Sequence, residues 1–361
     1  MKMLKLIFIL PIMACILFLS GCDTTDDPVP IPTLTVESAG TIAEFFPFHE
    51  NTVIVFDDTG PWGQSTFYTV YTDGNRMQRR ATMGSFIVTE VFEIADGELR
   101  VNHASVTSSG FEPLLDKKDE APMIILKEPL ELGNSWETHT GPTIQGVARG
   151  TSTITAVDVE IDTPCGVVSA IEVSREFEDG RLIVDYFAKG LGLVQSGYFV
   201  QGFERDQGDS RMFMEDMLVH LSLRSITENA PLDVELFLIF PNDDADDLDF
   251  AEITFSFMTN GDIIPAFETA FRNPAGRPYG LISQNTEINS IDVSWRPAPD
   301  SPQFDMTTVH LDLSADFAND MNVGALLEQL ILESLEFTMI EFFNAHEFIL
   351  TVDGQPHISS H

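Results

Sequence analysis

The chain has 361 residues, enough for two domains of ordinary size, and its 28 Phe residues and 43% hydrophobic content indicate packed cores. It carries 57 acidic against 19 basic residues, a formal net charge of −38. That charge excludes nucleic acid as a partner, because binding to phosphates needs Lys and Arg, and it would also repel anionic lipid headgroups. Two explanations of the acidity stay open: adaptation to a salty or alkaline exterior, and retention of divalent cations near a charged cell wall.

The first element is a short apolar segment that leads to a cysteine. Lys2 and Lys5 precede an uncharged run over residues 6–19, and Ser20-Gly21-Cys22 follows it. This is the layout of a secretory signal with a cysteine at the cleavage site. It resembles the lipobox of bacterial lipoproteins. The resemblance implies removal of residues 1–21, lipidation of Cys22, and a protein attached through its lipid to the extracytoplasmic face of the cell membrane.

Two other interpretations of this segment stay open. A transmembrane helix needs about 20 apolar residues, whereas this run has 14 and contains Pro11. An ordinary signal peptide with an incidental cysteine is the second alternative. Residues 22–33, which comprise Cys22 and a polar, proline-rich stretch, are expected to form the lipidated end and an extended tether.

Residues 34–205 alternate short strand-like runs with turn signals. Asp73-Gly74, Asp96-Gly97 and Asp179-Gly180 are strong hairpin signals. Strands are expected at residues 52–56, 65–72, 85–94, 98–106, 151–161, 167–174, 181–187 and 192–200. This pattern predicts an antiparallel β domain, either a curved sheet or a half-barrel, with no helix of useful length.

Several short motifs in this region match a segment found in surface lipoproteins of Gram-positive and endospore-forming bacteria. They are Phe46-Pro47-Phe48, residues 125–130, Gly133-Asn134-Ser135-Trp136, residues 163–166 and residues 185–194. The region resembles that segment, and the resemblance implies a curved antiparallel sheet similar to that of periplasmic lipoprotein carriers. It implies no particular chemistry.

Residues 206–231 are expected to connect this domain to a second one, at residues 232–361. There we expect strands at 236–240, 287–295, 308–313 and 347–352, and helices at 264–272 and 323–340. On the long helix, Leu327, Leu330, Ile331, Leu335 and Met339 share one face. Its acidic residues Glu328, Glu333 and Glu336 are expected on a solvated face or, alternatively, in a subunit contact.

Three motifs in the second domain match a known module. They are Phe240-Pro241-Asn242 with the acidic residues after it, residues 309–314, and the long helix followed by residues 348–355. The domain resembles the GerMN domain of sporulation and spore-germination lipoproteins. The resemblance implies a C-terminal α+β domain without known catalysis, linked to envelope assemblies. The fold class expected for the whole chain is therefore α+β, an antiparallel β domain followed by a GerMN-like domain.

The acidic loop after residue 240 is the weak candidate for a metal site. Asp243, Asp244, Asp246 and Asp247, with Asp249 nearby, offer carboxylates to a hard cation such as calcium. An EF-hand frame starting at Asn242 fails, because its sixth position is Asp247 rather than Gly and its twelfth is Ile253. A solvated loop is the simpler interpretation, so we expect no metal and no cofactor.

No catalytic motif stands out in the sequence. The only histidines at i, i+4 spacing are His357 and His361, in a tail without a helical pattern, and there is no His-Glu-x-x-His, Gly-x-Ser-x-Gly or phosphate loop. We therefore expect a non-enzymatic, lipid-anchored surface protein with a scaffold or interaction role, its partner an envelope protein or the cell wall. The alternative is a ligand-binding lipoprotein whose β domain holds a small apolar molecule.

Overall fold

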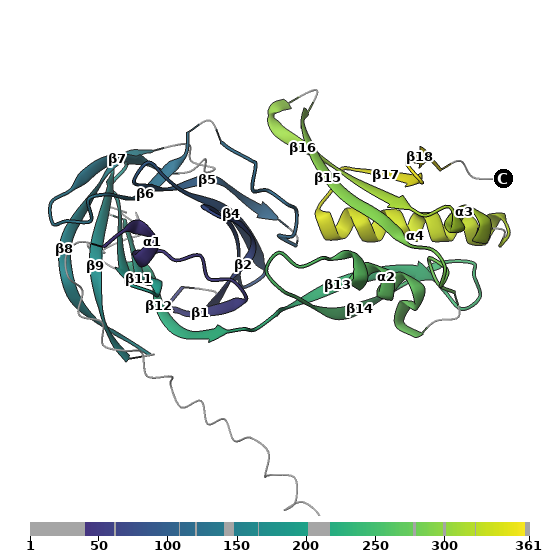
Figure 1. Ribbon diagram of the computed structural model, residues 1–361, viewed down its shortest axis with the longest axis horizontal. Coiled ribbons are helices and arrows are strands. Elements are labelled where there is room, and N and C mark those ends of the chain that lie inside the picture. The colour runs from purple at the N-terminus through teal and green to yellow at the C-terminus, as the bar shows by residue number, and fades with distance from the viewer. Residues whose placement is uncertain are drawn as a thin grey trace, which may run out of the picture.

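The computed structural model describes residues 40–60, 63–107, 109–119, 121–140, 148–164, 166–200, 217–276, 279–298, 301–321 and 323–357. Most of them lie in strands, and the first half of the chain forms one twelve-stranded antiparallel sheet curled into a near-barrel (Figure 1). Its strands are β1 (Thr52–Asp58), β2 (Gln64–Asp73), β3 (Arg76–Met83), β4 (Phe86–Ala95), β5 (Glu98–Thr107), β6 (Met123–Lys127), β7 (Ser135–His139), β8 (Arg149–Thr163), β9 (Gly166–Phe177), β10 (Arg181–Ala188), β11 (Gly192–Val200) and β12 (Met217–Glu228).

The predicted antiparallel β domain is confirmed, but it is more complete than a half-barrel. The strand order is β6-β5-β4-β3-β2-β1-β12-β11-β10-β9-β8-β7, so consecutive strands pair except β6 with β7, and β1 also pairs with β12. Asp96-Gly97 forms the two-residue turn between β4 and β5, Asp73 ends β2 with Gly74 in the turn to β3, and Asp179-Gly180 lies in the turn between β9 and β10.

Strand β12 corrects the expected connector at residues 206–231. Residues 217–228 pair with β1 on one side and with β11 on the other, so they complete the sheet. Residues 206–216 lie outside the described part of the chain. The signal segment at residues 1–21, Cys22 with the tether to residue 33, and Cys165 also lie outside it.

The two ends of the sheet, β6 and β7, meet through side chains. The Trp136 indole N–H and the Thr138 hydroxyl both donate to the carbonyl of Ile124, at 3.3 and 3.2 Å. The Asn134 amide donates to the Lys127 carbonyl at 2.8 Å. These bonds satisfy part of the backbone that a ladder would otherwise pair, so the seam is closed without strand pairing.

A four-residue helix, α1 (Ile42–Phe45), fills part of the barrel interior (Figure 1). Ile42 and Phe45 are fully buried among inward residues of β3 to β10, and the Phe46 ring lies 5.1 Å from that of Phe92. Glu44 ties the helix to the β10–β11 turn, because its carboxylate pairs with Lys189 at 2.7 Å. The interior is therefore a packed core.

The second half of the chain encloses one long helix between two sheets. The first sheet is a ribbon of β13 (Leu232–Pro241) and β14 (Leu248–Phe257), and the second has the order β15-β16-β17-β18 with β16 and β17 parallel. The remaining elements are α2 (Ile264–Arg272), η1 (Pro274–Gly276), β15 (Ile288–Ala298), β16 (Ser301–Leu313), α3 (Asp316–Asp320), α4 (Ala325–Phe343), β17 (Glu347–Val352) and β18 (Gln355–Pro356).

Helix α4 lies between the ribbon and the second sheet (Figure 1). Of the face predicted to be apolar, Leu330, Ile331, Leu335 and Met339 are buried. Glu328, expected on a solvated face, is 1% exposed, which corrects that prediction. A helix covered on opposite sides buries more than one stripe, so periodicity alone could not place Glu328.

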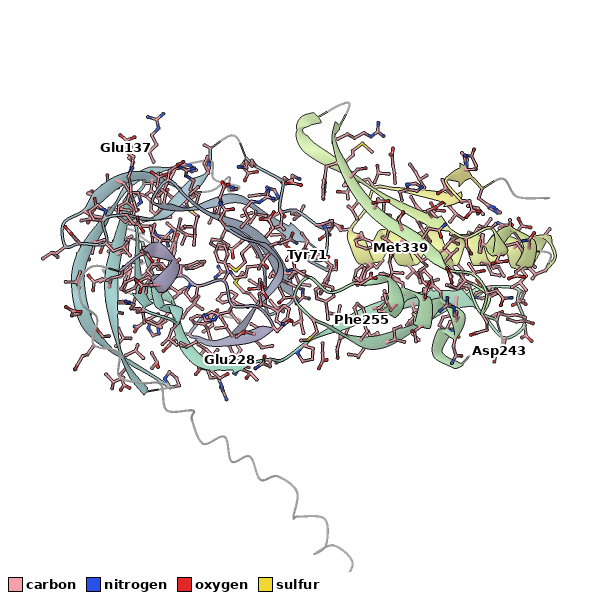
Figure 2. All side chains as sticks on the ribbon, in the orientation of Figure 1. Tyr71, Glu137, Glu228, Asp243, Phe255 and Met339 are labelled. Carbon is pink, nitrogen blue, oxygen red and sulfur yellow. The ribbon has the colours of Figure 1, made fainter. Side chains whose placement is uncertain are left out.

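The outer face of β2 packs into the core of the second half. Tyr68 and Val70 are fully buried against residues of β13, β14 and α4. Phe67 and Thr69, which alternate with them along the strand, face the barrel interior. The Tyr68 hydroxyl donates to the Phe257 carbonyl at 3.0 Å. Figure 2 shows the neighbouring Tyr71 at the boundary between the two halves.

The loop after β5 carries Phe111 into the same core. Its ring lies 4.9 Å from that of Phe257 and 5.8 Å from that of Phe342. The loop is held to the barrel by Gln78, whose amide donates to the Glu112 carbonyl at 2.7 Å and accepts from the Leu114 N–H at 2.6 Å. Thus the two halves share one apolar core.

Backbone groups at this junction are also paired across it. The Asn51 and Thr259 backbone N–H groups donate to each other's side chains at 2.7 and 2.8 Å, and the Thr259 hydroxyl donates to the Thr69 carbonyl at 2.8 Å. The Asn260 side chain accepts from the Thr72 N–H at 2.8 Å. Because both an apolar core and a polar network cross the junction, we infer that the halves move as one unit.

We predict that Phe111→Ala lowers the free energy of unfolding by about 3–5 kcal/mol, because it leaves a cavity in the shared core. Urea denaturation measures this change. Phe86→Ala is the matched control, since Phe86 is 51% exposed on β4 and its loss should change stability by less than about 0.5 kcal/mol. Similar losses in the two variants would contradict the shared core.

Candidate functional site

The four candidate metal ligands lie in the turn between β13 and β14, at the far end of the ribbon, where Figure 2 labels Asp243. The turn is organised by Asn242, whose side-chain amide donates to Asp246 at 2.8 Å and whose side-chain oxygen accepts from the Asp246 N–H at 3.1 Å. The Asp247 carboxylate accepts from the Leu248 N–H at 2.8 Å.

These hydrogen bonds occupy carboxylate oxygens of Asp246 and Asp247 within the turn itself. Within the described residues, no group of three or more His, Cys, Asp or Glu side chains is arranged to hold a metal ion. The acidic turn thus caps a hairpin, and its charge remains at the tip of the ribbon.

The barrel interior contains a cavity of about 30 Å³, beside the segment that follows α1. Its lining includes Phe46, Phe56, Phe67 and Met77, together with His49, whose buried Nε2 has no hydrogen-bond partner within the described part of the chain. Burial lowers the pKa of His49 below its ordinary value, so the imidazole is neutral near pH 7. The space suits about one water molecule, whereas small-molecule sites occupy about 300 Å³ or more.

The outer face of the β13–β14 ribbon carries exposed aromatic residues. Leu232, Val234, Leu236, Leu238 and Phe240 point into the core, so the alternate positions of β13 point to solvent. At those positions Phe237 is 37% exposed, and on β14 Phe250 is 63% exposed. The two rings stack with centroids 4.9 Å apart and planes 24° apart.

Ile239, opposite Phe250 in the register, joins the two rings in one surface patch. We call Phe237, Ile239 and Phe250 the ribbon patch. Glu252 lies directly opposite Phe237, and Glu235 is the next outward residue along β13. The patch is thus an apolar spot bordered by carboxylates, with the acidic turn beyond one end.

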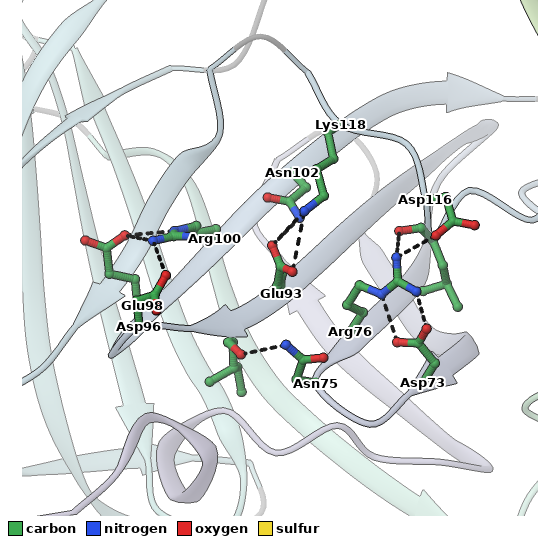
Figure 3. Close-up of polar contacts among 12 residues, drawn as sticks. Asp73, Asn75, Arg76, Glu93, Asp96, Glu98, Arg100, Asn102, Asp116 and Lys118 are labelled. Atoms are coloured by element: carbon green, nitrogen blue, oxygen red, sulfur yellow. Dashed lines mark hydrogen bonds and ion pairs between the residues drawn. The ribbon is translucent and has the colours of Figure 1, made fainter.

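Arg and Lys residues on the barrel form local ion pairs with carboxylates. Figure 3 shows Arg76 bound to Asp73 and, at 2.7 Å, to Asp116, and Lys118 bound to Glu93 at 3.2 Å. Such exposed pairs add about 0–1 kcal/mol of stability each, so their main effect is on the surface potential.

Residues 232–361 lack the cations for such pairing. They contain 23 acidic residues and only three Arg. Arg272 pairs with Glu268 at 3.0 Å, and Arg296 pairs with Glu347. Residues 232–361 thus carry a net charge of −20 (23 acidic minus 3 basic), a higher density per residue than the −18 (−38 minus −20) of the 231 residues before them.

A polar network covers the outer face of β16 and β17. The Thr351 hydroxyl donates to Asp312 at 2.5 Å, and His310 Nε2 lies 2.7 Å from the same hydroxyl oxygen. Partial burial alone would raise the pKa of Asp312, but hydrogen bonds from Thr351, the Gly354 N–H and Asn289 lower it below its ordinary value. Because the Thr351 hydroxyl donates its hydrogen bond to Asp312, its oxygen accepts one from His310 Nε2. Activation of a nucleophile needs the opposite direction.

Glu112 lies buried at the junction, next to Phe111. Burial raises its pKa from the ordinary 4.5 to about 7, although Arg80 and Lys117 nearby favour the charged form. Burial likewise lowers the pKa of Arg80 to about 10. Perturbed acids often mark active sites, but the main-chain carbonyl of Glu112 holds Gln78 and its surroundings are the shared core. We therefore assign it a structural role.

The sequence holds a partial signal for the ribbon patch. Residues 232–236 alternate apolar and acidic side chains, and the same phase continued to Phe237 points outward. Cys22, the predicted lipid site, lies outside the described residues.

No protein-family model and no curated protein matches the sequence. Two solved structures show weak likeness. One, from Bacteroides fragilis, is described as an exported protein with a YmcC-like fold; it is 13% identical with a TM-score of 0.31, and the match covers 51% of this chain and 99% of that one. The other, from Parabacteroides distasonis, is described as a lipoprotein; it is 10% identical with a TM-score of 0.30, covering 53% of this chain and 100% of that one. Likeness at this level carries no argument about this chain.

Among the described helices, none combines the length and the apolar character needed to cross a membrane.

We predict that Glu112 makes the protein less stable as pH rises. The folded state holds the Glu112 proton up to about pH 7 and the unfolded state only to about 4.5, so stability falls between these values and levels off above them. Relative to Glu112→Gln, the wild type should lose about 3 kcal/mol of unfolding free energy between pH 4 and pH 8. Urea denaturation of both proteins across this range measures the difference, and a pH-independent difference would contradict the prediction.

Proposed function

We propose that this protein is a lipid-anchored, extracytoplasmic surface protein that binds another envelope protein through the ribbon patch and has no catalytic role. The exposed stacked pair Phe237–Phe250 carries the proposal. Aromatic side chains are enriched at the centres of protein interfaces, where they bury large area at little entropic cost. Two of them stacked on an open strand face form a ready anchor.

The chemistry around the patch favours a basic partner. Glu235 and Glu252 border the rings, and the acidic turn lies beyond them. A second copy of this chain would bring like charges together, whereas a segment with apolar residues flanked by Lys or Arg matches both features. We therefore propose a heterologous partner with a cationic, amphipathic segment.

The packed barrel fits an interaction role better than ligand transport. Helix α1 and the aromatic residues around it occupy interior space that a bound apolar molecule would need, and the cavity beside them has about 30 Å³. The barrel then acts as a rigid base: the shared core at Tyr68 and Phe111 fixes the ribbon to it.

The resemblance of residues 232–361 to a GerMN domain, with a link to sporulation or germination, remains a proposal. In its support, α2, β15, β16, α4 and β17 lie where the sequence predicted them. The hairpin partner strand β14 was not predicted.

Lipid anchoring predicts that Cys22→Ala releases the protein from the membrane. Without the thiol no lipid can be attached, and residues 1–21 should stay uncleaved or be processed elsewhere. Membrane fractionation with a radiolabelled fatty acid measures both effects. Cys165→Ala is the control and should remain labelled and membrane-bound. Label retained in Cys22→Ala would contradict the assignment.

Partner binding predicts that Phe237→Ser and Phe250→Ser each weaken binding at least about ten-fold, the effect of losing an aromatic anchor. Both side chains are exposed, so the fold should persist. Crosslinking from intact membranes identifies the partner, and titration with the purified partner measures the Kd.

Val106→Ser is the control for this test, because Val106 is 66% exposed on β5 of the barrel and is not part of the ribbon patch. Binding should also weaken as salt rises, since the border charges are exposed. Equal binding by all three variants would contradict the proposal, and so would crosslinking that recovers nothing but the protein itself.

A further inference from the structure

A second cavity lies in the C-terminal half, away from the ribbon patch. It has a volume of about 280 Å³ and lies where α3, α4 and the end of the second sheet meet. Ala318, Met321, Val352 and Pro356 give it apolar walls, and Glu328, Gln355 and His357 add polar groups. Its size matches a small molecule rather than a single water.

Glu328 is an unusual wall residue, because it is 1% exposed. It lies one turn inside α4, and its backbone N–H donates to the carbonyl of the helix-capping Gly324 at 3.0 Å. The positive end of the helix dipole favours a carboxylate there. A carboxylate has about four acceptor positions, so it can bind a cationic donor in addition to its other contacts.

His357 is the second buried polar residue in the wall of this cavity. Its side chain is 10% exposed, and its Nε2 is buried without a hydrogen-bond partner among the described residues. The ring is held by an edge contact with Phe317 at 5.4 Å, and its backbone N–H donates to the Leu350 carbonyl at 3.2 Å. The sequence placed this residue in a tail without a helical pattern, so its fixed position is a finding of the structure.

The two polar groups face each other across a gap. His357 Nε2 lies 3.9 Å from Glu328 Oε1, which is too long for a hydrogen bond. A buried ring nitrogen left unpaired is unfavourable. A ligand that donates to both atoms would remove that penalty and would bring positive charge to the buried carboxylate.

We propose that this cavity binds a small primary ammonium ion. One N–H of the ammonium donates to Glu328, a second donates to His357 Nε2, and the short alkyl chain lies against Met321, Val352 and Pro356. The surplus of 23 acidic residues over three Arg in residues 232–361 raises the local concentration of cations. This site is separate from the ribbon patch and does not depend on partner binding.

The test uses the full-length lipidated protein in detergent, with histidine side chains labelled for NMR. The His357 signal is assigned by its loss in His357→Gln. Titration with n-butylammonium at pH 7.5 should shift this signal with saturation and a Kd on the order of 1 mM, the affinity expected of so small a ligand. Glu328→Gln, which keeps the shape and removes the charge, should weaken binding at least about ten-fold.

Two ligand controls keep the test sharp even if the variants are unstable. n-Butanol has the same size without the charge, and tetramethylammonium has the charge without N–H donors; each should bind at least about ten-fold more weakly to the wild type. Absence of a saturable shift would mean that the cavity holds only water and would overturn the proposal. Equal binding of n-butanol or of tetramethylammonium would overturn it too.

Discussion

The architecture depends on strand β2, which is buried on both faces. Phe67 and Thr69 complete the barrel core, whereas Tyr68 and Val70 belong to the core of the C-terminal half. A strand that alternates between two cores cannot slip by one residue without exchanging both sets of side chains. Its register therefore fixes the closed sheet and the docking of the ribbon together, and each large side chain it buries stabilises the junction by about 1.5–3 kcal/mol.

This constraint explains why the outward faces of the molecule are the candidate functional surfaces. Helix α1 and the Phe46 ring fill space inside the barrel, and the inward sides of β13 and β14 are committed to α4. What is left for recognition is the outer side of the ribbon and the C-terminal cavity. The ribbon can serve as a binding face because its inner side is anchored: an isolated two-stranded hairpin would be marginally stable, but this one is backed by a helix.

Local patterns predicted much of the β architecture, but closure was beyond them. Asp-Gly turns located the hairpins, since they report on the nearest residues in sequence. Strand β12 pairs with β1 although Glu228 follows its partner Thr52 by 176 positions (228 minus 52), and no local sequence pattern predicts such a distant pairing. Strand β3 was missed because its three Arg residues suggest a polar loop; in the fold Arg79 lies 4.5 Å over the Phe67 ring and pairs with Glu90. Strand β14 was predictable, because residues 251–257 alternate apolar and polar side chains; Phe250, outward, is the exception next to the acidic turn.

The candidate sites differ in the same way: a local pattern could predict one of them, and the other depends on contacts between distant residues. Phe237 could have been found, because residues 232–236 alternate apolar and acidic side chains and that phase, continued to residue 237, points outward. Glu328 could not, since a helix covered on two sides has no periodicity that separates a solvated acid from a buried one. His357 depends on a contact with Phe317 that only the assembled sheet provides. Both candidate sites pair carboxylates with apolar surface, which links them to the one global property visible from composition. The acid surplus of the C-terminal half then has a use beyond solubility, because it biases both sites toward cations.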